Sequence, residues 1–323
     1  MKRLIIAAAF ASLLSGAAIA QEAYPNQPIT IIVPFAIGGP SDVLARLFSQ
    51  SFAETLRQQV IVENVTGAGG TIGSLKVARS RPDGYTLLFS QISGMAPIAA
   101  YYKNPPYDAL RDFEPVARVA DVPFLILTRK SAPVNTVKEF VQWVKENGGK
   151  LNFGTGGVGG VSMGLVILNS AIGTKMTGVP YRGTSLALQD LVAGRLDLMA
   201  DQPTSAVPQI KAGAVKVIAV MSDRRSSALP DVPTAAEGGL ENVEVNIWNG
   251  MFAPKGTPQA VIDKLHGAVS TALADESVKK RMALLGAEQP IGDSSKPGPF
   301  RAFIQSEINR WVPMMKAAGV VPQ

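Results

Sequence analysis

Short apolar runs alternate along the chain with stretches in which apolar residues recur every three or four positions. Three early runs have the length of strands: residues 29–35 (ITIIVPF), 60–63 (VIVE) and 85–90 (YTLLFS). Between the first two runs, four apolar residues have i+4 spacing: Leu44, Phe48, Phe52 and Leu56. That spacing predicts a helix with one face in the core, with Ser41 or Asp42 as its N-cap. With a second helix ending near Arg79, the pattern predicts a βαβαβ unit and an α/β fold.

The rest of the chain continues this alternation. Further strands are expected at residues 116–119, 124–128, 151–153, 178–181, 196–199, 215–221 and 247–252. Further helices are expected at residues 136–147, 163–168, 186–192, 208–212, 258–274 and 299–316. Thr136 and Glu139 have the spacing of a capping box, and Thr184 or Ser185 is the expected N-cap of the helix at 186–192. Residues 97–113 have no clear period and are expected to form a loop.

The first twenty residues have the features of a secretory signal peptide. Lys2 and Arg3 precede the apolar run 4–14, and the small-x-small sequence Ala18-Ile19-Ala20 predicts cleavage after Ala20. No later stretch reaches the roughly 18 apolar residues of a membrane-spanning helix. The mature protein is therefore expected to be exported, and its 300 or so residues are enough for two domains.

Composition excludes several kinds of site. The chain has no cysteine and a single histidine, His266, so disulfides, thiolate chemistry and the common metal sites are not expected. We therefore predict no metal and no cofactor. The formal charge of +6 falls to +4 when the signal peptide is removed, and no basic run is present. Nucleic acid is not an expected partner.

A glycine-rich segment, residues 151–162 (LNFGTGGVGGVS), is the most informative stretch. It leads from a strand into an apolar helix, so its backbone N–H groups and the helix N-terminus would face the same point. Glycine allows a ligand to approach the backbone closely, and the unpaired N–H groups favour an anion. No acidic residue occurs from 151 to 189. The segment therefore predicts an anion site, although it could also serve only to turn the chain.

Two catalytic or cofactor motifs also match this segment. Gly154, Gly156 and Gly159 spell GxGxxG, but dinucleotide binding needs an acidic residue after the next strand, where Arg182 stands. Ser162 is the centre of a GxSxG sequence, which leaves a secreted serine esterase with His266 as an alternative. Against it, the serine does not follow the strand directly, and His266 lies at the flank of an apolar helix face. A non-enzymatic binding protein is the preferred interpretation.

Several motifs together resemble one family. They are ITIIVPFAIGGPSDVLAR (29–46), VENVTGAGGTIG (62–73), RPDGYTLL (81–88), YDALRDFEPVARV (107–119), VPYRG (179–183), LPDVPTAAEGG (229–239) and WNGMFAPKGTP (248–258). In this order they resemble the Bug family, the periplasmic solute receptors of tripartite tricarboxylate transporters, over nearly the whole mature chain. The resemblance implies a type II periplasmic binding protein. In that fold two α/β lobes with mostly parallel sheets are joined by crossing strands and close on a small carboxylate.

The resemblance also implies lobes, partners and contacts. We place lobe 1 at residues 21–124 and 245–323, and lobe 2 at 125–244. The partners would be a small carboxylate and the transporter's membrane components, for a periplasmic monomer; a receptor that feeds a sensor protein is the alternative. The expected ligand contacts are Phe35, Ala36, Ile37, Gly38, Gly39, Ser41 and Asp42 in the first loop, Ser90, Gln91, Ser93 and Gly94 after the third strand, Thr155, Gly156, Gly157, Gly159 and Ser162 in the central loop, and Asp201.

Individual residues refine this expectation. Arg182 could bind a distal carboxylate with its planar guanidinium, and Tyr181 could stack on a ligand or pack between strand and helix. Asp42 could pair with Arg46 at i+4 or order the first loop. Met163 and Gly164 replace the histidine and leucine common in relatives, and Ile37 replaces a smaller residue or proline. These changes make the cleft more apolar and favour an aromatic or long aliphatic carboxylate, including a dicarboxylate.

Overall fold

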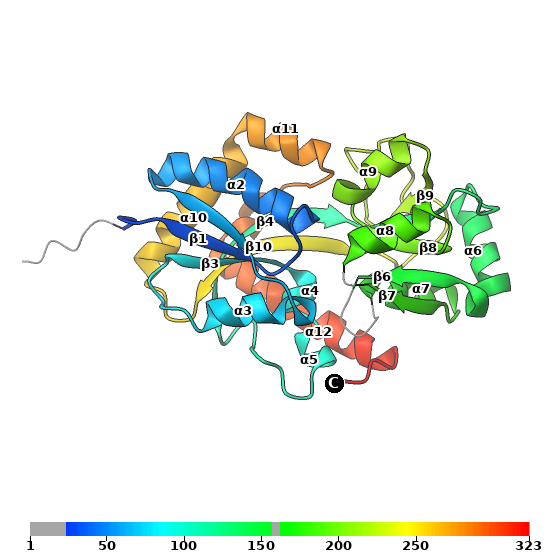
Figure 1. Cartoon of the computed structure of the whole chain (residues 1–323), viewed down its shortest axis with the longest axis horizontal. Helices are drawn as coiled ribbons and strands as arrows, with labels where there is room; N and C mark the ends of the chain where they lie inside the picture. The colour runs from blue at the N-terminus through cyan, green and yellow to red at the C-terminus, as the bar shows by residue number, and fades with distance from the viewer. Residues whose placement is uncertain (1–23, 157–161, 182, 323) are drawn as a thin grey trace, which may run out of the picture.

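Two mixed β-sheets form the framework of the chain (Figure 1). The computed structural model describes residues 24–156, 162–181 and 183–322. The strand order of the first sheet is β2 (Val60–Asn64), β1 (Ile29–Val33), β3 (Thr86–Gln91), β10 (Asn246–Pro254) and β4 (Phe113–Pro123). The strand order of the second sheet is β7 (Thr177–Pro180), β6 (Asn152–Thr155), β8 (Leu198–Asp201), β5 (Leu125–Arg129) and β9 (Val215–Val220).

Helices cover both faces of the first sheet. One face packs against α2 (Pro40–Leu56), α10 (Gln259–Ala274) and α11 (Glu276–Leu284). The other face packs against α3 (Thr71–Ala78), α4 (Ile92–Met95), α5 (Ile98–Tyr101) and α12 (Pro297–Ala317). The predicted stripe Leu44, Phe48, Phe52 and Leu56 is buried on the first of these faces, as its spacing requires.

The second sheet has a similar construction. Its helices are α6 (Val137–Asn147), α7 (Met163–Ile172), α8 (Thr184–Val192) and α9 (Pro203–Lys211). Apolar residues of α8 and α9 pack on one face, and those of α6 and α7 pack on the other. Short 3₁₀ helices at Ala68–Gly70, Gly148–Lys150 and Gly292–Ser295 complete the fold. No helix within the described residues is long and apolar enough to span a bilayer.

One strand in each sheet runs against the other four. In the first sheet this is β10, which pairs antiparallel with β3 and β4. In the second sheet it is β5, antiparallel to β8 and β9. The chain passes from β4 to β5 at Phe124 and returns along β10, and Figure 1 shows β4 and β10 side by side between the lobes. The predicted lobe boundaries at 124/125 and 244/245 fall in these connections and stay a prediction.

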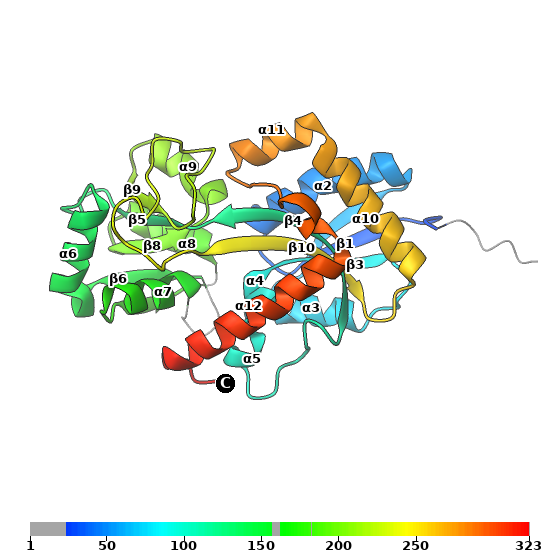
Figure 2. The same ribbon diagram turned by 180° about the vertical axis from the view of Figure 1, so that it is seen from behind.

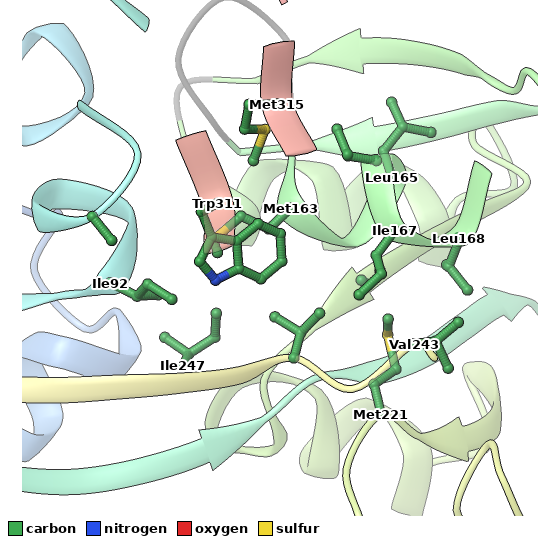
Figure 3. Close-up of a cluster of buried hydrophobic side chains, with 14 of the residues drawn as sticks. Ile92, Met163, Leu165, Ile167, Leu168, Met221, Val243, Ile247, Trp311 and Met315 are labelled. Atoms are coloured by element: carbon green, nitrogen blue, oxygen red, sulfur yellow. The ribbon is translucent and has the colours of Figure 1, made fainter. Parts of the chain in front are cut away.

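One apolar cluster continues from the first lobe into the second. Figure 2 shows α12 running diagonally in front of the first sheet toward the second lobe. Figure 3 shows Trp311 and Met315 of α12 close to Met163 of α7, with Ile247 of β10 below them. All four side chains are at most 4% exposed. The two lobes therefore share a packed apolar contact along this edge.

Of the predicted helix N-caps, one is confirmed and two are wrong. The capping box of α6 is confirmed, because Thr136 and Glu139 exchange both bonds. Helix α2, however, begins at Pro40 with Gly39 as N-cap, and neither Ser41 nor Asp42 caps it. Gly183 is the N-cap of α8 in place of Thr184 or Ser185.

Four helix assignments also differ from the prediction, and one of them is α4, which was not predicted. The segment 97–113 was expected to be a loop but contains α5. Helix α11 was not predicted, although its N-cap Asp275 accepts bonds from Ser277 N and Val278 N. Helix α9 begins at Pro203, five residues before the predicted 208–212, because proline is tolerated in its first turn.

Candidate ligand-binding site

The loop after β1 and the ends of β3 and β8 lie where the two lobes approach each other: Gly38 lies beside helices α8 and α9, and Gln91 is bonded to Gln202. In open α/β sheets, ligands bind beyond the carboxyl ends of the parallel strands. A cavity of about 430 Å³ lies between the first loop and helices α8 and α9. Its lining residues are Gly38, Ser185, Leu188, Gln189, Val192, Thr204, Ser205 and Gln209. The first loop therefore faces the second lobe across this cavity.

Asp42 holds the first loop in place. Its carboxylate accepts hydrogen bonds from Gly38 N at 2.9 Å, Asn64 Nδ2 at 2.9 Å and Arg46 Nε at 3.1 Å. Asn64 also donates to Phe35 O at 3.1 Å. Burial alone would raise the pKa of the Asp42 carboxyl, but the bonds from Arg46, Gly38 and Asn64 outweigh it and hold that pKa below its ordinary value. Asp42 thus pairs with Arg46 and orders the loop, but it does so without capping α2.

Asp42→Ala is expected to lower the free energy of unfolding by about 1–3 kcal/mol, because it removes the buried carboxylate that accepts three hydrogen bonds, one of them from a guanidinium. Because the pKa of Asp42 is lowered in the folded protein, its contribution is present above about pH 4 and lost as pH falls through the folded value. Urea unfolding at pH 7 and pH 3 measures this. Glu63→Ala, which removes an exposed pair with Lys76, is the control. Equal effects of the two variants at pH 7 would contradict the prediction.

The other residues of the first loop divide between surface and interior. Ala36, Ile37 and Gly38 are exposed, and Ile37 is 76% exposed. Phe35 and Gly39 are half-buried. Ser41 is buried and donates to Asn249 Oδ1 at 3.0 Å, which joins the start of α2 to β10. The apolar side chain of Ile37 is therefore exposed to solvent.

The end of β3 lies at the base of the cleft, on the side of the first lobe. Ser90 is fully buried, Gly94 is buried, and Gln91 and Ser93 are half-buried. A Cβ at position 94 would lie 2.8 Å from Ser90 Oγ, which explains the glycine. Gln91 Oε1 accepts a bond from Gln202 Nε2 of the second lobe at 3.4 Å. Gln202 was not predicted as a site residue, because its importance depends on this contact between lobes.

The central loop begins in tight contact with α8. Thr155 is fully buried and donates to Val179 O at 3.2 Å. A Cβ on Gly156 would lie 2.9 Å from Thr184 N, so this position needs glycine. Ser162 is the half-buried N-cap of α7, without a side-chain capping bond. The predicted contacts Gly157, Gly159 and Arg182 lie outside the described residues.

Asp201 and Tyr181 form hydrogen bonds with residues of their own lobe. Asp201 is fully buried and accepts bonds from Gln202 N at 2.9 Å and Ser205 Oγ at 2.8 Å. Burial raises the pKa of its carboxyl to about 6, against the lowering effect of these bonds. Tyr181 donates its hydroxyl to Asp190 Oδ2 at 2.7 Å, on α8. This favours the packing role of Tyr181.

The esterase arrangement receives no support from the positions of its residues. His266 lies on α10 in the first lobe, and its Nε2 is 3.4 Å from Ser270 Oγ. Ser162 begins α7 in the second lobe. Within the described residues, no group of three or more carboxylate and histidine side chains could hold a metal ion.

The sequence model of the tripartite tricarboxylate transporter family receptors matches residues 44–320. This chain belongs to that receptor family. The structure of the periplasmic binding protein BugD is 42% identical, with a TM-score of 0.85, over 93% of this chain and all of that one. MatC from Rhodopseudomonas palustris, solved with malate, is 39% identical, with a TM-score of 0.83, over 90% of this chain and all of MatC.

A third structure extends the comparison. Rpa4515 of R. palustris, solved with adipate, is 31% identical, with a TM-score of 0.85, over 93% of this chain and all of that one. These similarities confirm the resemblance to the Bug family and the periplasmic binding protein fold with two lobes. The family is one of solute receptors that are periplasmic binding proteins.

Proposed function

We propose that this protein captures a small carboxylate between its two lobes and delivers it to the membrane components of a tripartite transporter. The observation that carries the proposal is the cavity between the first loop and helices α8 and α9, with the fold of a carboxylate receptor around it. Relatives solved with malate and adipate support a carboxylate as the ligand class. The predicted contacts of the two loops, Ser90, Gln91 and Asp201 belong to this proposal.

The absence of catalysis, the export of the protein, its monomeric state and its closure on the ligand are part of the same proposal. The chain acts as a binding protein and not as an enzyme, because Ser162 and His266 belong to different lobes. It is exported as a monomer, with its signal peptide cut after Ala20. Ligand can drive lobe closure only if it binds the closed form more tightly than the open form. Membrane components would then recognise the closed form.

A thermal-shift screen of the mature chain, residues 21–323, tests the ligand class. The probes are mono-, di- and tricarboxylates, both aliphatic and aromatic, with the matching amides as neutral controls. At about 100 times its Kd, a ligand adds roughly 2.7 kcal/mol to stability, which corresponds to a shift of several degrees. We expect a shift from one carboxylate class and none from its amides. A shift from amides alone would overturn the proposal.

A further inference from the structure

A second groove lies between helix α9 of the second lobe and helix α11 of the first lobe. It has a volume of about 540 Å³ and is lined by Lys211, Ser227, Ala228, Lys280, Ala283 and Leu284. All six differ from the residues that line the cavity beside the first loop. Figures 1 and 2 both show α9 and α11 at the upper edge of the molecule, with α12 and α7 on the lower side. Each lobe therefore supplies one wall of this groove.

Contacts between the lobes lie beside the groove. Ser227 Oγ donates to Ala283 O at 3.4 Å. A Cβ on Gly286 would lie 2.4 Å from Pro203 Cβ, so the turn after α11 packs against the first residue of α9. Because α9 and α11 belong to different lobes, the width of the groove depends on how the two lobes are arranged.

Basic and apolar side chains line the groove, and none of its six described lining residues is acidic. Lys211 and Lys280 come from opposite walls, and both are exposed. Within residues 24–156, 162–181 and 183–322, neither ammonium group forms a hydrogen bond or an ion pair. Between them, Ala283 is exposed and Leu284 is 76% exposed. This surface is complementary to a protein segment that has carboxylates beside an apolar side chain.

The lobes also meet at the edge between α12 and α7, which is filled by their own side chains. Trp311 and Met315 pack there against Met163 (Figure 3). Met163 was expected to make the cleft more apolar, but it is buried in this contact instead. A partner that distinguishes the open from the closed form must contact both lobes, because rigid lobes differ between these forms only in their relative position. The groove between α9 and α11 exposes side chains of both lobes to such a partner.

We propose that this groove docks an acidic segment of the transporter's membrane component. Carboxylates of the segment pair with Lys211 and Lys280, and an apolar side chain packs on Ala283 and Leu284. This inference rests on the proposed function. The ion pairs join the two lobes through the partner, so the strength of docking depends on the distance between α9 and α11. Recognition of the lobe arrangement is thereby assigned to a surface outside the ligand cleft.

Uptake into proteoliposomes tests the inference. The vesicles contain the membrane components from the same organism, and the mature receptor is added outside at increasing concentrations. The solute is malate, adipate or another carboxylate that the thermal-shift screen identifies. For Lys211→Glu/Lys280→Glu, we expect the receptor concentration at half-maximal uptake to rise roughly tenfold or more, because two attractive contacts become repulsive. The plateau rate and the Kd for the carboxylate should keep their wild-type values, since neither lysine lines the cavity beside the first loop.

Matched variants assign the effect to the groove. Lys103→Glu/Lys138→Glu makes the same change in net charge with one exposed lysine on each lobe, away from the groove, and should keep the wild-type value. Lys211→Arg/Lys280→Arg retains both charges and should keep it as well. Each single glutamate variant should raise the half-maximal concentration by less than the double variant does, because the segment contacts both lobes.

The outcomes separate this inference from the proposed function. Wild-type uptake by the double glutamate variant, shown by circular dichroism to be folded, would overturn the inference alone. The same holds if only one of the single variants had an effect, or if the double variant bound the carboxylate more weakly by the same factor. If the wild type bound no carboxylate, or drove no uptake of one that it binds, the proposed function would fail and the inference with it.

Discussion

Glu307→Leu is expected to lower the free energy of unfolding by about 2–5 kcal/mol, because two buried donors would lose their acceptor. Glu307 Oε2 accepts bonds from Trp248 Nε1 at 3.2 Å and from Trp311 Nε1 at 3.3 Å. Both indole rings are fully buried, and Glu307 is 8% exposed. Urea unfolding followed by near-UV circular dichroism measures the change.

Glu307→Gln is the matched control for this prediction. Its amide oxygen can take the place of Oε2 and accept from both indoles, while the charge is removed. Burial raises the pKa of the Glu307 carboxyl, so the charge itself is unfavourable there. The glutamine variant should therefore stay within about 1 kcal/mol of wild type. A leucine variant as stable as the glutamine variant would contradict the prediction.

The position of Glu307 gives this result a bearing on function. Trp248 lies on β10, one of the strands that connect the lobes, whereas Trp311 lies on α12. Figure 3 shows Trp311 close to Met163, the first residue of α7, which follows the central glycine loop. Glu307 thus joins the crossing strand to the helix that contacts the second lobe, and its loss would loosen the apolar contact between lobes.

The sequence predicted the elements that have strong apolar patterns. Strands β1 and β3 are buried on both faces, so their sequences are continuous apolar runs. The i+4 stripe of α2 is confirmed because one face of this helix packs on the first sheet. Helix α11 was missed because only Val278 and Met282 of its nine residues are buried, which gives too short a period to recognise.

The candidate site was less predictable, because its contacts depend on tertiary distances. The glycine at position 156 is explained by its approach to Thr184, which lies 28 residues later in the chain. The bond between Gln91 and Gln202 joins residues 111 positions apart, on different lobes. Neither partner could be paired from spacing. The resemblance to the family placed the loops, but it did not indicate Gln202.

Asp42 and Asp201 are both buried acidic residues at the cleft, but their pKa values move in opposite directions. Asp42 has a guanidinium and two N–H donors beside it. Asp201 forms no ion pair within the described residues, and burial dominates its pKa. The ionised form of Asp201 is therefore disfavoured in the folded protein.

Asp201→Asn is expected to make the protein more stable than wild type above pH 7, by about 1–3 kcal/mol. The pKa of Asp201 is about 6 in the folded protein, against an ordinary value of 3.8. Between these values the folded state holds more protons than the unfolded state, so wild-type stability falls as pH rises. Asparagine keeps its oxygen for Gln202 N and can donate its amide to Ser205 Oγ.

The test is the difference in unfolding free energy between wild type and Asp201→Asn at pH 4, 6 and 8. The variant's advantage should be small at pH 4, grow through pH 6 and level off by pH 8, while contributions of other titrating groups cancel in the difference. Asp293→Asn, at an exposed aspartate, should show no such trend. A constant difference across this range would mean that Asp201 does not change its protonation on folding, and that its carboxylate has a compensating partner in the cleft.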